Sequence, residues 1–187
     1  MPIWPAMDDL TALAIAAGRG DRAALDRLVR ASQGAVWRYC RHMVGADAAD
    51  DATQETFIRA IRTLPSFGAR SSALTWLISI ARRACADWVR AQQRSRRLRD
   101  RLQSVVAGQP STSTPSDRLD LDVLVGMLPD ERREAFVLSQ VLGFSYHEVA
   151  LICDCPVGTV RSRIARARIE LLEYFQIEGN QLRAEGD

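Results

Sequence analysis

The sequence has no long hydrophobic run. Its longest apolar stretches, such as residues 12–17 and 135–138, are far shorter than the roughly 20 residues that a membrane helix needs. The N-terminus, residues 1–9, has no basic segment followed by an apolar one, and it carries Asp8 and Asp9 where a secretory signal would be positive. We therefore expect no membrane insertion and a cytoplasmic location.

Histidine is scarce, with only two in the chain. His42 and His147 lie far apart in the sequence, and neither accompanies a recognisable nucleophile pattern. We expect no catalytic residue, no cofactor and no enzymatic activity.

Cysteine is also sparse, and the four are widely spread: Cys40, Cys85, Cys153 and Cys155. In a reducing cytoplasm such cysteines are by default small buried apolar side chains rather than a disulfide framework. The alternative is a zinc or thiol-redox site at Cys153, Cys155 and His147. That set lacks a clear fourth ligand, so no metal is expected.

The composition is that of a globular protein. The chain has 187 residues, 47% of them hydrophobic and 26% charged. Its net charge is only +2, so the whole-molecule balance does not indicate a nucleic-acid partner. The distribution of charge along the chain, which is uneven, has to be considered instead.

Apolar residues recur at spacings of three and four almost throughout, which predicts an all-α fold. Gly, Pro and Ser residues separate the helical segments. The expected helices are Asp8–Gly18, Asp21–Val44, Asp47–Thr63, Ser72 to about Arg101, Arg118–Met127, Asp130–Leu142, Ser145–Ile152 and Val157 to about Phe175.

A change of composition divides the chain. Residues 108–116 are small and polar and include Pro110 and Pro115, a composition typical of linkers. We expect two small helical domains, residues 1–101 and 118–187, joined by a flexible linker at 102–117.

The C-terminal segment has the pattern of a helix-turn-helix. Ser145 and Glu148 form a capping-box pattern, a short break follows, and Pro156 stands where a second helix can begin. On a helical wheel the apolar stripe is Val160, Ile164, Ala167 and Leu171.

The opposite side of this second helix is small in the middle and cationic at the edges. It carries Ser162, Ala165 and Arg166, flanked by Arg161, Arg163 and Arg168. Such a surface suits the major groove, where small residues allow close approach and arginine contacts guanine or phosphates. The alternative is a solvated arginine face without a partner.

An acidic helical face occurs in the N-terminal domain. Asp47, Asp50, Asp51 and Gln54 share it at spacings of three and four, with Glu55 beside them. It is either an acidic first turn that stabilises the helix start or a docking face for a basic partner.

The loop from Phe67 to Trp76 is rich in small, hydrogen-bonding residues and could hold an unstacked base. The alternative, which we favour for Trp76, is that both aromatic residues are core anchors.

The helix that follows is the most cationic stretch of the chain. It carries Arg82, Arg83, Arg90, Arg94, Arg96, Arg97, Arg99 and Arg101. This charge predicts DNA binding that weakens steeply with salt.

These motifs together resemble the extracytoplasmic-function (ECF) sigma factors of the sigma-70 family of bacterial RNA polymerase. The segment 50–60 resembles region 2.2, 67–76 region 2.3, 80–101 region 2.4, 128–136 region 4.1, and 145–150 with 155–168 region 4.2. The resemblance implies a sigma2-like and a sigma4-like domain that direct promoter recognition.

The resemblance also implies partners and site residues. The partners are promoter DNA, an anti-sigma factor, and core RNA polymerase through its β′ coiled coil and β flap. The implied core-binding residues are Asp47, Asp50, Asp51, Gln54, Glu55 and Phe57. Those for the minus-ten element are Phe67, Arg70, Ser71, Ser72, Trp76, Arg82, Arg83, Asp87 and Arg90. Those for the minus-thirty-five element are Val157, Gly158, Thr159, Arg161, Ser162, Arg163 and Arg166.

One residue departs from the family pattern. Many members have asparagine after the segment 80–82, whereas this chain has Arg83, whose side chain only donates hydrogen bonds. The minus-ten preference is therefore expected to differ. A stand-alone helix-turn-helix regulator is the alternative function, but it would leave the acidic face and the loop 67–76 unused.

Overall fold

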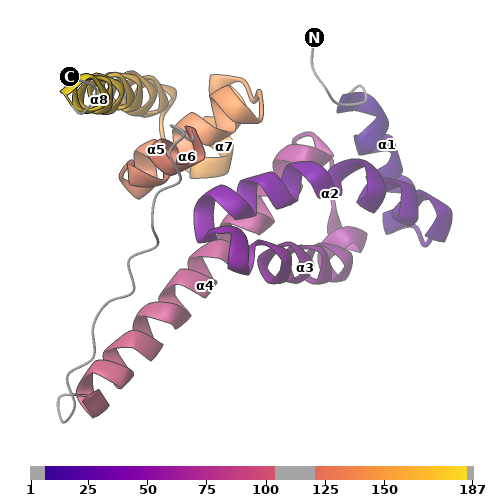
Figure 1. Ribbon diagram of the computed structural model, residues 1–187. Coiled ribbons are helices and arrows are strands. Elements are labelled where there is room, and N and C mark those ends of the chain that lie inside the picture. The colour runs from indigo at the N-terminus through magenta and orange to yellow at the C-terminus, as the bar shows by residue number, and fades with distance from the viewer. Residues whose placement is uncertain (1–6, 104–120, 185–187) are drawn as a thin grey trace.

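The structure is a computed structural model of the chain, and it describes residues 7–103 and 121–184 (Figure 1). Every regular element in these two ranges is a helix, which confirms the all-α fold. Below, residues 7–103 are called the N-terminal unit and residues 121–184 the C-terminal unit. Across the described residues, no helix is both long and apolar enough to cross a membrane.

The N-terminal unit is a helical bundle followed by a long projecting helix. Its elements are α1 (Met7–Gly18), α2 (Arg22–Val44), α3 (Ala46–Thr63), the 3₁₀ turn η1 (Leu64–Ser66) and α4 (Ala73–Gln103). Helix α2 packs against α1, α3 and α4, and the far part of α4 extends away from the bundle (Figure 1).

The C-terminal unit consists of α5 (Leu121–Met127), α6 (Asp130–Phe136), the π-helical turn η2 (Val137–Val141), α7 (Tyr146–Cys153) and α8 (Val157–Ala184). Helix α8 packs against α6, α7 and α5. The π turn continues α6, because the amide of Leu142 donates to the carbonyl of Val137, five residues earlier.

The observed helices follow the expected ones within a few residues, with two corrections at the ends of long helices. Helix α8 continues to Ala184 rather than ending near Phe175, and Leu102 and Gln103, expected in the linker, belong to α4. The rest of the expected linker lies outside the described residues.

Local chemistry accounts for the connection between the first helices. The carboxylate of Asp21 accepts a hydrogen bond from the amide of Ala24 (3.0 Å) and so caps the start of α2. Gly45 follows α2 with a φ of 86°, a conformation that costs glycine little, and α3 begins at the next residue. The chain therefore reverses with almost no loop.

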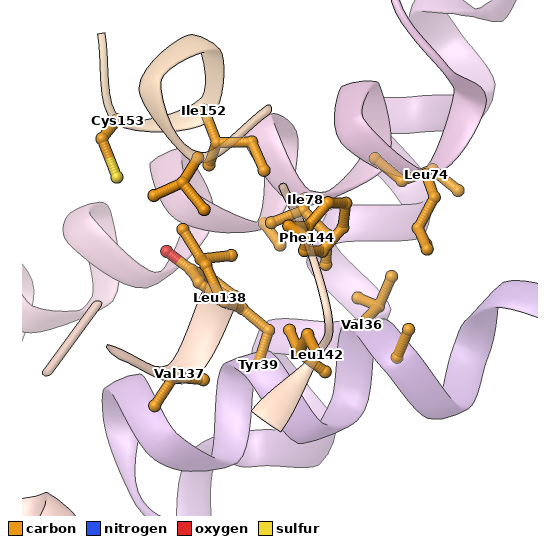
Figure 2. Packing of buried hydrophobic residues seen from close by; sticks show 14 of the residues in the cluster. Val36, Tyr39, Leu74, Ile78, Val137, Leu138, Leu142, Phe144, Ile152 and Cys153 are labelled. Carbon is orange, nitrogen blue, oxygen red and sulfur yellow. The ribbon is translucent and has the colours of Figure 1, made fainter. Parts of the chain in front are cut away.

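The apolar face of α4 lies at the centre of the molecule. Leu74, Leu77, Ile78 and Ala81 are buried. Each leucine or isoleucine side chain contributes roughly 1.5–3 kcal/mol when it leaves water. The buried cluster also includes residues of α6, η2 and α7, and Figure 2 shows Leu138, Leu142 and Phe144 near Val36 and Ile78. The two units thus pack against each other, which the linker composition did not predict.

Gly18 provides a test of the packing between α1 and η1. A Cβ atom at this position would lie 2.7 Å from the carbonyl oxygen of Leu64, which is backbone and cannot rotate away. We expect Gly18→Ala to lower the free energy of unfolding by about 1–3 kcal/mol in urea denaturation.

The matched control is Gly34→Ala in α2, where no atom lies within 4 Å of the new methyl group. This change should raise the free energy of unfolding by about 1 kcal/mol, because alanine favours the helix. A Gly18→Ala protein as stable as the wild type would contradict the close approach.

Candidate functional site

Local hydrogen bonds and backbone conformation define the ends of α7 and the start of α8. The hydroxyl of Ser145 accepts from the amide of Glu148 (3.3 Å), and the Glu148 carboxylate accepts from the amide of Ser145 (2.9 Å), which confirms the capping box. Asp154 ends α7 in the left-handed conformation (φ 52°). The carbonyl of Pro156 then accepts from the amide of Thr159 (2.9 Å) and starts α8. The two helices are thus fixed in a helix-turn-helix.

The two sides of α8 divide as the helical wheel predicts. Val160, Ile164, Ala167 and Leu171 are buried, and Arg161, Ser162, Ala165 and Arg166 are exposed. The hydroxyl of Ser162 donates to the carbonyl of Thr159 (2.9 Å), so it is turned back onto its own helix. Val157, Gly158 and Thr159 form the first turn of α8, where Gly158 is exposed. The exposed surface can approach a nucleic-acid groove and offers guanidinium donors.

The flanking arginines have partners inside the protein. Arg163 pairs with Glu131 of α6 (2.5 Å), contacts the sulfur of Cys155 (3.7 Å), and its side chain is only 19% exposed. Arg168 donates to Gln140 (2.8 Å). Of the arginines predicted to contact DNA, Arg161 and Arg166 face outward, whereas Arg163 braces α8 against α6.

The acidic face is present on α3. The six residues expected to bind core polymerase differ in their exposure and in their partners. Asp47, Asp50, Asp51 and Gln54 are exposed. Glu55 forms an ion pair with Arg59 (2.7 Å), and Phe57 packs partly against the core. An exposed carboxylate face of this kind can dock a basic partner.

Helix α2 supplies a wall of this site that sequence reasoning missed. The indole N–H of Trp37 donates to Asp50 (2.7 Å), and the guanidinium of Arg41 lies 5.6 Å from the Trp37 ring centre. Beside them is a hollow of about 430 Å³ lined by Gln33, Gly34, Trp37, Asp50, Thr53 and Gln54. The spacing of Gln33 and Trp37 places them on one face of α2, but it gives no indication that this face meets α3.

The loop before α4 forms a second hollow, of about 320 Å³. It is lined by Ser66, Phe67, Gly68, Arg70, Ser71 and Trp76. The Phe67 and Trp76 rings lie 4.9 Å apart at an interplanar angle of 45°, and both are half-buried against the core. Ser72 instead caps α4, because its hydroxyl accepts from the amide of Thr75 (3.1 Å). The two aromatic residues are therefore packed against the core and also line an open hollow.

Further along α4, several predicted site residues are engaged within the protein. Arg82 donates to Glu134 of α6 (2.9 Å), whereas Arg83 is exposed. Asp87 pairs with Arg59 (2.7 Å) and Arg90 (2.5 Å), and these hydrogen bonds, the one from Arg59 foremost, lower the pKa of its carboxyl.

The positive charge of α4 comes entirely from arginine, since the sequence contains no lysine and all 25 basic residues are arginine. Guanidinium groups suit phosphate contacts because they present several donors in a fixed plane. The side chains of Arg96, Arg97, Arg99 and Arg101, in the predicted cationic stretch, lie outside the part described in atomic detail.

The cysteines follow the simplest expectation. Cys40, Cys85 and Cys153 are buried and Cys155 is half-buried, and all four are free thiols. Burial raises the pKa of the Cys153 thiol, and the nearby charge of Glu134 raises it further. Over the described ranges, no three His, Cys, Asp or Glu side chains come together in a way that could hold a metal ion.

Comparison with known proteins identifies relatives over most of the chain. Residues 28–95 match the family model for sigma-70 region 2, and residues 118–171 match that for sigma-70 region 4. The ECF RNA polymerase sigma factor SigC of Mycobacterium tuberculosis is 44% identical over 171 residues, which cover 89% of this chain and 92% of that protein. The ECF RNA polymerase sigma-E factor of Escherichia coli is 36% identical, over 80% of this chain and 85% of that protein.

Two solved structures share the fold. One is the sigma factor RpoE in complex with the anti-sigma factor NepR from Bartonella quintana, with a TM-score of 0.65, 28% identity, and coverage of 81% of this chain and 96% of that one. The other is CnrH in complex with the cytosolic domain of CnrY, with a TM-score of 0.70, 25% identity, and coverage of 91% and 99%.

Arg163 and Arg161 on α8 differ in their environments, and the free energy of unfolding of alanine variants tests this difference. Arg163→Ala removes the ion pair with Glu131 and the packed stem of the side chain, so we expect the free energy of unfolding to fall by about 1 kcal/mol. The exposed control Arg161→Ala should stay within about 0.5 kcal/mol of the wild type. Urea denaturation measures both, and equal losses would mean that Arg163 does not brace the helix.

Proposed function

The chain belongs to the ECF sigma factors of the sigma-70 family, and on this premise we propose that it binds core RNA polymerase and directs transcription initiation at specific promoters. One observation carries the proposal. A single chain holds both an exposed carboxylate face on α3 and a separately capped helix, α8, that exposes Arg161 and Arg166. A DNA-binding regulator without a polymerase partner has no use for the first surface.

The acidic face is proposed as the docking site for the β′ coiled coil of the polymerase. Asp47, Asp51 and Gln54 are exposed there and available to a basic partner, while Asp50 is oriented by Trp37. We add Trp37 to this surface because its ring forms one side of the same hollow. Glu55 and Phe57 support the surface through Arg59 and through the core.

Unpaired minus-ten bases are proposed to bind at the hollow between Phe67 and Trp76 and along the start of α4. The half-buried rings offer faces for stacking, and Arg70 and Ser71 line the opening. Ser72 shapes the site by capping α4, and Arg83 is exposed for base or phosphate contact. Arg82, Asp87 and Arg90 would have to exchange their present partners to join them.

Duplex DNA at the minus-thirty-five element is proposed to contact the outer side of α8. Arg161 and Arg166 supply contacts to bases or phosphates, and the small side chain of Ser162 allows the helix to approach the groove. The first turn of α8, residues 157–159, lies near the DNA backbone. Arg163 contributes mainly by holding α8 in place through Glu131.

The remaining partners follow from the family and from exposed apolar side chains. Ile169, Leu172 and Phe175 are exposed along α8 and suit a protein partner such as the β flap. An anti-sigma factor is proposed because both solved relatives are complexes, one of them with a protein described as such. We also propose that the chain acts in the cytoplasm, in two domains, by binding alone, while the polymerase performs the chemistry.

Run-off transcription tests the function directly. Purified chain and core RNA polymerase, incubated with a pool of genomic promoter fragments, should yield discrete transcripts that core polymerase alone does not make. The start sites would report both promoter elements. Failure to produce any specific transcript or to co-purify with core polymerase would leave the stand-alone regulator as the better account.

A charge reversal tests the docking face. Asp51→Arg should weaken binding to core polymerase at least about tenfold, because it brings a cation to a surface that meets a basic partner. The control Asp9→Arg makes the same change at an exposed site on α1, away from α3, and should bind like the wild type. Binding can be measured by fluorescence anisotropy of labelled chain, and equal affinities for both variants would rule out this face.

A further inference from the structure

A series of three ion pairs runs from α3 to α4. On α3, Nε of Arg59 donates to the carboxylate of Glu55 (2.7 Å), and a terminal nitrogen of the same guanidinium donates to Asp87 on α4 (2.7 Å). The other carboxylate oxygen of Asp87 accepts from Arg90, three residues further along α4 (2.5 Å). Arg59 thus joins the two helices through Asp87, a carboxylate that it shares with Arg90.

Asp87 places a negative charge on a surface proposed to bind DNA. It lies on the same face of α4 as Trp76 and Arg83, which precede it by eleven and four residues. Arg90 and Arg94 continue this face toward the end of the helix. A carboxylate without a second partner would repel DNA phosphates here and would hold Arg90 to itself. The surface therefore needs another cation at Asp87.

Arg59 is the more firmly held of the two cations around Asp87. Its side chain is 34% exposed, against 60% for Arg90, and two carboxylates hold it at two different nitrogens. The hydrogen bond to Asp87, followed by the one to Glu55, raises the pKa of the Arg59 guanidinium. The pair of Asp87 and Arg90 lies within one turn of a helix, and exposed pairs at this spacing contribute little. Arg90 is therefore the partner that can leave.

The chemistry of the groups allows Arg90 to exchange its partner. A guanidinium has five N–H donors, and a phosphate is a strong charged acceptor for them. When Arg90 turns to a phosphate, Asp87 keeps the hydrogen bond from Arg59 and remains neutralised. Without Arg59, the same turn would leave a lone carboxylate beside the DNA backbone, where like charges repel. Arg59 thus favours the exchange without touching DNA itself.

We propose that Arg59 is a positioning residue of the minus-ten site, which holds and neutralises Asp87 so that Arg90 can exchange Asp87 for a phosphate of the single strand. The inference rests on the proposed function, because it requires this face of α4 to meet DNA. It adds to the site a residue of α3 that the sequence did not indicate. It also gives Asp87 an indirect part, exerted through the two arginines.

The test measures binding of a fluorescent single-stranded oligonucleotide by the holoenzyme, assembled from the full chain and core RNA polymerase. The oligonucleotide carries the minus-ten element of a promoter found by run-off transcription, and anisotropy is followed at several salt concentrations. Arg59→Ala should weaken binding about tenfold and should make the slope of log K against log salt shallower by about 0.7, the share of one phosphate contact in a single strand.

A second substitution should restore binding, which a purely structural role of Arg59 would not allow. Asp87→Asn removes the negative charge that Arg59 neutralises, so adding it to Arg59→Ala should bring the affinity back to within about twofold of the wild type. The double variant has the net charge of the wild type, because it loses one cation and one anion. A double variant that binds no better than Arg59→Ala would overturn the proposal.

Arg62→Ala is the matched control for the loss of charge. Arg62 is exposed one turn further along α3, and its removal leaves the three ion pairs in place. It should change the affinity by less than about twofold, because an exposed charge away from the contact is largely screened. Equal weakening by Arg62→Ala and Arg59→Ala would overturn the proposal. If circular dichroism shows that Arg59→Ala has unfolded, Arg59→Met, which keeps the apolar stem, decides in its place.

Binding to core polymerase, measured first, separates this inference from the function on which it rests. Core polymerase is then added to saturation, so that a change in docking does not enter the affinity for DNA. If the chain does not bind core polymerase, the proposed function fails, and the same variants are compared by binding of the free chain to oligothymidylate at low salt. Phosphates are common to all sequences, so loss in Arg59→Ala and recovery in the double variant would still support the exchange. Absence of that pattern, or no binding by the wild type, would overturn it.

Discussion

The structure depends on the burial of one face of α4. Leu74, Leu77, Ile78 and Ala81 lie on that face, and helices from both units pack against it. Because these side chains fix the rotation of α4 about its axis, they also fix which side of the helix carries its arginines outward. The hollow at Phe67 and Trp76 depends on the same constraint, because the first turn of α4 is anchored in the core.

The C-terminal unit uses the same principle on a smaller scale. The buried stripe of α8 sets the direction of its outer side, and the capped start of α7 with the left-handed Asp154 sets the angle between the two helices. A surface suited to a DNA groove then needs only small residues and the exposed guanidinium groups of Arg161 and Arg166. Arg163 and Arg168 hold α8 in place, since their hydrogen-bond partners lie on α6 and η2.

The helices, their caps and the buried stripe of α8 were predictable because they depend on residues three or four apart. The acidic face was predictable for the same reason. The roles of Trp37, Arg163 and Arg82 were not, since each depends on a partner 13 to 52 residues away in the chain. Charge alone could not distinguish an arginine that faces solvent from one that holds two helices together.

The sequence by itself determined the all-α class, the starts of the capped helices and the two sides of α8, because helical periodicity and capping act over a single turn. It also contained the motifs that relate the chain to its family. Only the tertiary structure decided that the two units share one core and that Glu134 meets Tyr39 and Arg82. Contacts across 95 and 52 residues arise from packing whole helices together, and no local pattern encodes them.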